Sequence, residues 1–260
     1  MANGEKQVLL VVGATGSIGR HVLAAGLRHG YLVRALVRDP GRAKDLPPGV
    51  QVVAGDMTRA GTLSAAVDGI DAVIFTQGTY GNSPLAKDVD YGGVRNILQA
   101  LDGRAVRIGL MSTIGATDRR GSHDWKRRGE RLVRASGLPY TIVRPAWFDY
   151  NRPDQLKLLM LQGDKDLVGS PADGVIARRQ IAEVLVRSLA SEAALRKTFE
   201  LHAGTGPEQE DFDAVFAPLA ADPAGALDGA LDRANMPLEG EPVAIRYDLQ
   251  TVRDRVSPGI

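Results

Sequence analysis

The sequence predicts an α/β protein built on a doubly wound parallel sheet, and three observations lead to this prediction. Short apolar runs alternate with amphipathic stretches from residue 8 to residue 189. The first run, Val8 to Val12, has no polar alternation, as expected of a strand buried on both faces. A glycine-rich turn follows it directly, Gly13 to Gly19, and leads into an amphipathic stretch that stops near Gly30.

This strand, turn and helix are typical of the opening of a dinucleotide-binding βαβ unit. Gly13 permits the tight turn, Gly16 lets the backbone approach a pyrophosphate, and Gly19 allows helix and strand to pack closely. Free N–H groups and the helix dipole favour phosphate at the helix start. The alternative is a glycine-rich turn in another α/β fold. The residues of the turn expected to bind the cofactor are Gly13, Thr15, Gly16, Ser17, Ile18 and Gly19.

The second predicted strand, Tyr31 to Val37, ends in an arginine. In NAD-binding proteins of this architecture an acidic residue near this point binds the ribose 2′-hydroxyl. Here Arg38 occupies that place, with Arg42 close behind. Because a guanidinium is always charged and binds phosphate bidentately, the sequence favours NADP(H) over NAD(H). The alternative is a solvated loop arginine.

The third and fourth predicted strands also end in residues placed for a cofactor. Val50 to Ala54 is followed by Asp56 and Met57, expected beside the adenine, although Asp56 or Thr58 could simply cap a helix at Arg59 to Val67. Asp71 to Phe75 ends where the carboxyl edge of a sheet meets the ligand crevice. The residues after it expected to bind the cofactor are Thr76, Gln77 and Gly78.

The remaining elements are predicted from apolar periodicity. Up to Pro145 they are a helix from Leu85 to Leu101, a strand from Val106 to Met111, a helix from about Asp124 to Ala135 and a strand from Tyr140 to Val143. After Pro145 they are a helix from about Asp154 to Leu161, a hairpin from Asp166 to Ile176, a helix from Arg178 to Leu189, a strand from Lys197 to His202, a helix from Asp211 to Leu219 and an amphipathic piece near Asp248 to Val256. We expect residues 1–145 to form the nucleotide-binding core. Residues 146–260 should complete the sheet and form a substrate cap over its carboxyl edge.

Composition excludes several other classes of function. The formal charge of +1 argues against a nucleic-acid partner held by phosphate contacts. The chain has no cysteine, so it has no disulfide, thiolate nucleophile or cysteine metal site. Its four histidines lack ligand spacing, so we expect no metal. Neither a signal peptide nor an apolar run of about 20 residues is present, which predicts a cytoplasmic protein without a membrane partner. The oligomeric state is left open.

Five motifs, taken in order, resemble those of a known family. They are Gly13-Ala-Thr-Gly-Ser-Ile-Gly19, Gly55-Asp56, Asp90-Tyr-Gly-Gly-Val-Arg-Asn96, Met111-Ser-Thr113 and Arg134-Ala-Ser-Gly-Leu-Pro-Tyr-Thr-Ile-Val-Arg-Pro145. From about Gln7 to Leu189 the chain resembles the atypical short-chain dehydrogenases/reductases, of the extended or NmrA-like branch. The resemblance implies a Rossmann sheet that binds NAD(P). Within the family the sequence is most similar to ketoreductases of aromatic polyketide antibiotic clusters.

The resemblance also implies a catalytic Ser/Thr, a Tyr and a Lys four residues after that Tyr. Thr113 and Lys126 match the first and the last, but Ser122 stands where the tyrosine belongs. A serine hydroxyl is too weak an acid and too short to replace the phenol. Lys126 could still bind the nicotinamide ribose, or be a solvated lysine, and Pro145 should abut the nicotinamide. His123 could titrate near neutral pH, although a lone loop histidine is more often incidental.

Aromatic residues in two segments are expected to face the crevice. These candidate substrate-binding residues are Tyr80, Trp147, Phe148 and Tyr150. Flat side chains supply a large contact area at low entropic cost, which suits a polycyclic or phenolic ketone, although Trp147 and Phe148 could equally be core. The favoured hypothesis is an NADPH-dependent ketoreductase that takes its proton from water or a substrate hydroxyl. The alternatives are an NAD(P)H quinone reductase and a catalytically silent NADP-binding sensor or regulator.

Overall fold

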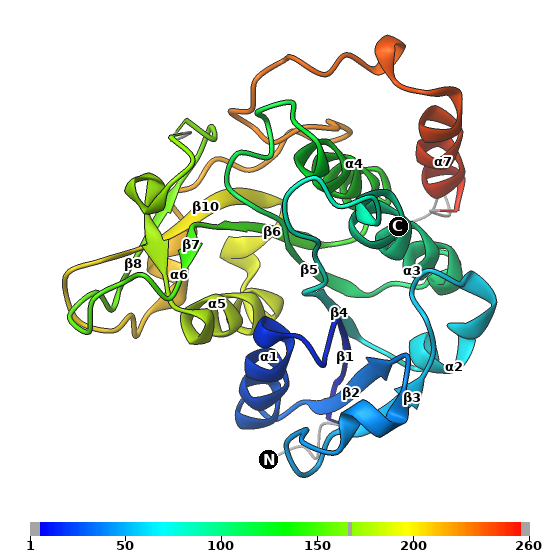
Figure 1. Ribbon diagram of the computed structural model, residues 1–260, viewed down its shortest axis with the longest axis horizontal. Coiled ribbons are helices and arrows are strands. Elements are labelled where there is room, and N and C mark those ends of the chain that lie inside the picture. The colour runs from blue at the N-terminus through cyan, green and yellow to red at the C-terminus, as the bar shows by residue number, and fades with distance from the viewer. Residues whose placement is uncertain (1–5, 166–167, 256–260) are drawn as a thin grey trace.

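The computed structural model describes residues 6–165 and 168–255, which form an eight-stranded sheet with helices on both faces (Figure 1). The strand order is β3-β2-β1-β4-β5-β6-β10-β8, and every pairing is parallel except that of β8 with β10. The strands are β1 (Val8–Val12), β2 (Leu32–Val37), β3 (Gln51–Ala54), β4 (Ala72–Phe75), β5 (Arg107–Met111), β6 (Tyr140–Pro145), β8 (Lys157–Leu161) and β10 (Lys197–Gly204). The predicted doubly wound sheet is thus confirmed. Its order reverses between β1 and β4, which opens a crevice at their carboxyl ends.

Two hydrophobic cores lie on opposite faces of this sheet. The helices are α1 (Ser17–Arg28), α2 (Ser64–Val67), α3 (Gly93–Leu101), α4 (Ser122–Ala135), α5 (Arg178–Ala190), α6 (Phe212–Phe216) and α7 (Val243–Asp254). In β1, Leu9 and Val11 join the core that includes α1 and α5, whereas Leu10 and Val12 join the core that includes α3 and α4. Figure 1 shows these two helix pairs on opposite sides of the sheet. The unbroken apolar run in β1 is explained by this burial on both faces. No helix of the described residues is long and apolar enough to cross a bilayer.

The predicted helix from Asp154 to Leu161 is wrong, because its second half is strand β8. In β8, Leu158 is buried and Met160 half-buried, whereas Leu159 and Leu161 are exposed. This is a period of two in a short apolar run, which periodicity alone cannot distinguish from a helix. Antiparallel pairing with β10 decides the conformation.

The predicted hairpin from Asp166 to Ile176 is also wrong where it can be compared. Residues 166–167 lie outside the described residues. The rest forms a 3-10 turn, Pro171–Asp173, followed by β9 (Val175–Ile176), which pairs in parallel with β7 (Trp147–Phe148). This long-range pairing puts the aromatic residues of β7 at a fixed place beside the sheet.

Other predicted helices differ in extent. The segment from Arg59 to Val67 is a 3-10 turn, Ala60–Thr62, followed by the single turn of α2, and Gly61 lowers its helix propensity. In the segment from Leu85 to Leu101, a π-helical stretch at Lys87–Gly92 leads into α3. The tail helices occupy Phe212–Phe216 and Val243–Asp254, whereas the predicted ones were Asp211 to Leu219 and Asp248 to Val256. Residue 256 lies outside the described residues.

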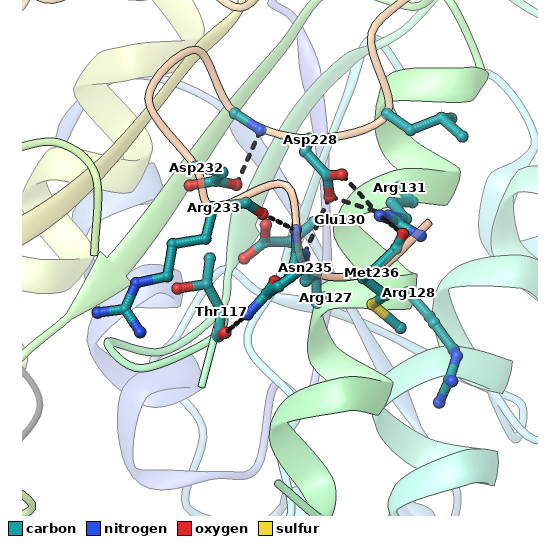
Figure 2. A network of polar contacts seen from close by, with 12 residues as sticks. Thr117, Arg127, Arg128, Glu130, Arg131, Asp228, Asp232, Arg233, Asn235 and Met236 are labelled. Atoms are coloured by element: carbon teal, nitrogen blue, oxygen red, sulfur yellow. Dashed lines mark hydrogen bonds and ion pairs between the residues drawn. The ribbon is translucent and has the colours of Figure 1, made fainter. Parts of the chain in front are cut away.

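Residues 222–241, which we call the C-terminal strap, cross helix α4 and are held there by polar contacts (Figure 2). Arg127 Nε donates to Asp228 Oδ1 at 3.0 Å, and Arg131 Nη2 donates to Asp228 Oδ2 at 2.6 Å. Asn235 accepts from Arg127 Nη1 at 2.5 Å and donates through Nδ2 to the carbonyl of Thr117 at 2.9 Å. The strap therefore fixes α4 and the loop that precedes it.

Beneath the strap, Glu130 is fully buried between two arginines. Arg144 Nη2 lies 2.7 Å from Glu130 Oε2, and Arg144 Nη1 lies 2.7 Å from Asp232 Oδ1 of the strap. Arg134 contacts the same Glu130 oxygen at 3.3 Å. Burial by itself raises the pKa of Glu130, but Arg144 and Arg134 hold the pKa below its ordinary value, so the carboxylate is charged. Removing one partner from such a buried network leaves an uncompensated charge and destabilises the folded protein.

Candidate functional site

A cavity of about 1460 Å³ opens at the carboxyl ends of β1 and β4, and it brings the predicted site residues together. Those that line it are Gly13, Thr15, Gly16, Ser17, Ile18, Arg38, Asp56, Met57, Thr76, Gln77, Gly78, Tyr80, Thr113, Ser122, Lys126, Pro145, Trp147, Phe148 and Tyr150. Gly19 lies outside the lining. A Cβ atom on Gly19 would collide with the backbone of Gly13 and Ala14, so its role here is close packing of helix against strand.

The glycine turn has the geometry of a phosphate cradle. Gly13 adopts φ +83°, and a Cβ atom there would lie 2.7 Å from the backbone nitrogen of Gln77. Gly16 precedes α1 with an ordinary φ of −74° and no side-chain cap on the helix. A Cβ atom on Gly16 would meet only the Gly13 carbonyl, at 3.1 Å. Space beside Gly16 and the N–H groups of the first turn of α1 are therefore available to an anion.

The end of β2 presents two cations to the same cavity. Arg38 is exposed, and neither its guanidinium nor that of Arg42 has a hydrogen bond or ion pair within the described part of the chain. Asp39, which lies between them in the sequence, caps the turn that follows it. Its Oδ1 accepts from the backbone N–H of Gly41 at 2.9 Å and caps the 3-10 turn Pro40–Ala43. The carboxylate is thus occupied, whereas the guanidinium groups can take a phosphate.

Asp56 and Met57 lie at the neighbouring wall. Asp56 Oδ1 accepts from the N–H of Thr58 at 2.9 Å and from its hydroxyl at 2.8 Å, which closes a local turn. The alternative that this segment caps a helix is wrong, because among the described residues neither the 3-10 turn Ala60–Thr62 nor α2 has a side-chain cap. The Met57 carbonyl accepts from Asn96 Nδ2 at 2.8 Å. Helix α3 therefore fixes the wall expected to face the adenine.

Lys126 points inward from α4 and is not a solvated lysine. Its side chain is 11% exposed, and Nζ donates to Asp90 Oδ1 at 2.8 Å. Asp90 also accepts from the N–H of Thr79 at 3.1 Å. A Cβ atom on Gly78 would lie 2.9 Å from Nζ, so this glycine leaves room for the ammonium. The two remaining donors of Lys126 can serve ribose hydroxyls.

Two buried polar atoms in this wall test whether the residues fit a cofactor. Gln77 and Ser112 are 7% and 4% exposed, and Gln77 Oε1 and Ser112 Oγ have no hydrogen-bond partner among the described residues. Buried polar atoms are nearly always paired, so this wall is shaped for a polar ligand. Thr76, by contrast, donates to the carbonyl of Val12 at 2.9 Å and ties β4 to β1. A dinucleotide therefore fits the turn and the wall. Within residues 6–165 and 168–255 there is no cluster of three or more side chains that could hold a metal.

The candidate proton donors differ in burial and in their position along the cavity. Ser122 is 6% exposed at the first residue of α4. His123 Nδ1 lies 2.6 Å from the carbonyl of Gly115 and must donate to it, since a carbonyl only accepts. Tyr80 and Tyr150 are 79% and 63% exposed at the mouth of the cavity. Thus no phenol among them lies beside Lys126 in the buried part of the site.

The aromatic residues form one side of the mouth. Trp147 and Tyr150 pack edge to face with ring centroids 6.3 Å apart. The guanidinium of Arg178 lies 5.3 Å from the centroid of Phe148. Both side chains of β7 are half-buried, so they are neither fully core nor fully free.

The structure also brings in residues that the sequence did not single out. Asp90 was named only as the first residue of a family motif, in a segment expected to be helical, and no contact with Lys126 was predicted for it. Arg178 and Asp149 line the cavity from segments after Pro145. No local pattern marks either of them, because their contacts are long-range.

A family model described as NAD(P)H-binding matches residues 13–192. The chain belongs to this family. Sanguinarine reductase of Eschscholzia californica is 26% identical over 270 residues, which cover 84% of this chain and 98% of the relative. NAD(P)H azoreductase of Xenophilus azovorans is 30% identical over 219 residues, which cover 82% and 73%.

A solved structure has the same fold as this NAD(P)H-binding chain. It is a Bacillus halodurans protein assigned as an NAD-dependent epimerase/dehydratase, with TM-score 0.66 and 24% identity, and the match covers 82% of this chain and 97% of that one. The predicted Rossmann fold and NAD(P) cofactor are thus confirmed, and the chain is an NAD(P)H-dependent oxidoreductase. The closer likeness to polyketide ketoreductases stays a prediction.

Proposed function

We propose that this protein is an NADPH-dependent ketoreductase for a polycyclic aromatic, polyketide-like ketone, and that it works without a tyrosine acid. The observation that carries the proposal is the composition of one cavity. Its inner part holds the glycine turn and Lys126, and its mouth holds aromatic side chains. Ser122, which by the family resemblance stands where a tyrosine is expected, lines the same cavity. We assign the cap over the mouth to the unit of residues 146–260.

The roles of the residues follow from their positions. When bound, NADPH supplies the hydride that reduces the carbonyl carbon. Lys126 binds the ribose, and Thr113 orients the carbonyl oxygen. The aromatic side chains hold a flat substrate against the nicotinamide in a near-attack geometry, which can account for much of a rate enhancement. The proton for the oxygen comes from water or from a hydroxyl next to the carbonyl.

Replacing Arg38 should separate the two cofactors. In Arg38→Ala the affinity for NADPH should fall about tenfold or more, because a charge-assisted contact of roughly 1.5–3 kcal/mol is lost. NADH, which lacks the 2′-phosphate, should bind almost as before. Dissociation constants from cofactor fluorescence check this. Equal losses for both cofactors would remove the assignment of Arg38 to the 2′-phosphate.

Removing any of four candidate acids should have little effect on turnover. A true general acid contributes on the order of 10²–10⁴ in rate. For Ser122→Ala, Tyr80→Phe, Tyr150→Phe and His123→Ala we expect kcat at saturating NADPH to fall by no more than about tenfold. The reason is that the proposed proton source is water or a substrate hydroxyl, which these variants leave in place. A loss of about a thousandfold in kcat for one variant, with cofactor binding intact, would identify that residue as the acid.

A quinone reductase is the second candidate, and the missing phenol favours it, since a quinone accepts hydride readily. Product analysis with matched panels of aromatic ketones and quinones distinguishes the two. Ketone turnover supports the proposal. Reduction of quinones alone supports the second candidate, and tight NADPH binding without turnover in either panel indicates a sensor.

A further inference from the structure

Arg178, the first residue of α5, reaches from the C-terminal half of the chain to the glycine turn. It lines the cavity, and its side chain is 29% exposed. Its Nε donates to the hydroxyl of Ser17 at 3.1 Å. Ser17 is the first residue of α1, so the guanidinium lies beside the helix end that faces the cofactor phosphates.

The counter-ion of Arg178 is Asp149. Arg178 Nη1 forms an ion pair with Asp149 Oδ2, and the backbone N–H of Arg178 donates to Asp149 Oδ1 at 2.9 Å. Burial by itself raises the pKa of Asp149, but the hydrogen bonds and the positive charge of Arg178 outweigh burial and lower the pKa below its ordinary value. The carboxylate is therefore charged. No acceptor among the described residues contacts Arg178 Nη2. The guanidinium thus keeps donors for a further ligand.

The arginines of α1 are engaged elsewhere. Arg20 donates to the backbone carbonyls of Asp45 at 2.8 Å and Thr15 at 3.3 Å. Arg28, at the far end of α1, pairs with Glu183. The first turn of α1 has no acidic side chain that could neutralise Arg178.

We infer that Arg178 binds the pyrophosphate of the cofactor, and that Asp149 is the counter-ion that the pyrophosphate replaces. A fork of N–H donors matches two phosphate oxygens, and a dianionic pyrophosphate competes for it with a single carboxylate. The same guanidinium lies over Phe148, so it joins the cofactor site to the aromatic mouth. The inference rests on the cofactor binding included in the proposed function.

The test uses ADP-ribose, which contains the pyrophosphate but neither the nicotinamide nor the 2′-phosphate. Its dissociation constant is measured by calorimetry for the wild type and three variants. Arg178→Ala should weaken ADP-ribose about tenfold or more, as expected for a lost charge-assisted contact. It should weaken NADPH and NADH equally. Arg38→Ala should leave ADP-ribose unchanged.

Asp149→Asn is the variant that separates a phosphate ligand from a structural brace. Asp149 has φ +60°, a conformation that asparagine also tolerates, so the backbone should be preserved. The variant breaks the same ion pair but removes a negative charge near the phosphates, so ADP-ribose should bind as tightly as to the wild type or more tightly. Similar weakening in Asp149→Asn and Arg178→Ala would overturn the inference, as would an unchanged affinity in Arg178→Ala.

The outcomes also distinguish this inference from the proposed function. A wild-type protein that does not bind ADP-ribose contradicts both. Wild-type binding that Arg178→Ala leaves intact contradicts the role of Arg178 alone. A failure to reduce aromatic ketones contradicts the proposed activity and leaves the binding result standing.

Discussion

Gly16→Val should abolish NADPH binding while the protein stays folded. Gly16 has an ordinary backbone conformation, and an added Cβ atom would meet only the Gly13 carbonyl, at 3.1 Å. The protein therefore tolerates a side chain there, but the branched side chain occupies the space that the pyrophosphate needs. Loss of two or more charge-assisted hydrogen bonds, roughly 1.5–3 kcal/mol each, corresponds to a loss of affinity of at least about a hundredfold.

Fluorescence titration with NADPH and a thermal unfolding curve measure binding and folding separately. Gly16→Ala is the matched control and should retain partial binding. Gly13→Val should behave differently, because φ is +83° and its Cβ atom would collide with Gln77, so this variant should lose stability as well. A folded Gly16→Val protein with wild-type affinity would mean that the phosphates lie elsewhere.

Glu130→Gln should destabilise the protein by about 3–5 kcal/mol, since it removes one partner from a buried ion-pair network. Arg144 and Arg134 lose the carboxylate between them, at a site where Glu130 is fully buried. The pKa of Glu130 is lowered in the folded state, so its charge contributes stability above its ordinary pKa of 4.5. This contribution is lost as the pH falls below that value, and the difference between variant and wild type should shrink in acid.

Chemical denaturation at neutral and acid pH measures this effect. Glu208→Gln is the control, because Glu208 also lies 2.7 Å from an arginine, Arg179, but is 66% exposed. It should change the free energy of unfolding by no more than about 1 kcal/mol. Equal effects of the two variants would show that the network beneath the C-terminal strap does not hold α4.

Most of the strands could be predicted because they are marked by local apolar patterns, whereas their order in the sheet was not predicted. Strands β1 and β4 are apolar throughout and almost fully buried, so each gives the unbroken apolar run that predicts a strand buried on both faces. Strand β8 was not predicted, since the apolar run at residues 158–161 is compatible with either period and only its pairing with β10 decides. The contacts of the C-terminal strap with α4 could not be predicted either. Arg127 stood in a basic run that could have been solvated, yet its side chain is 0% exposed and paired with Asp228.

The candidate site divides in the same way. Residues of the glycine turn and of the strand ends could be predicted, because their chemistry is set by neighbours in sequence. Arg178 and Ser17 are 161 residues apart, and Lys126 and Asp90 are 36 apart. Such pairs arise from the packing of α5 and α4 against the sheet, and no single-sequence pattern encodes them.

The most direct test of the account follows a label from cofactor to product. The protein is incubated with NADPH that carries two deuterium atoms at C4 of the nicotinamide and with polycyclic aromatic ketones, and the products are analysed by mass spectrometry and NMR. The account predicts an alcohol with one deuterium on the former carbonyl carbon, formed by the wild type and not by Gly16→Val. Tight NADPH binding without any deuterated alcohol across the ketones would contradict it.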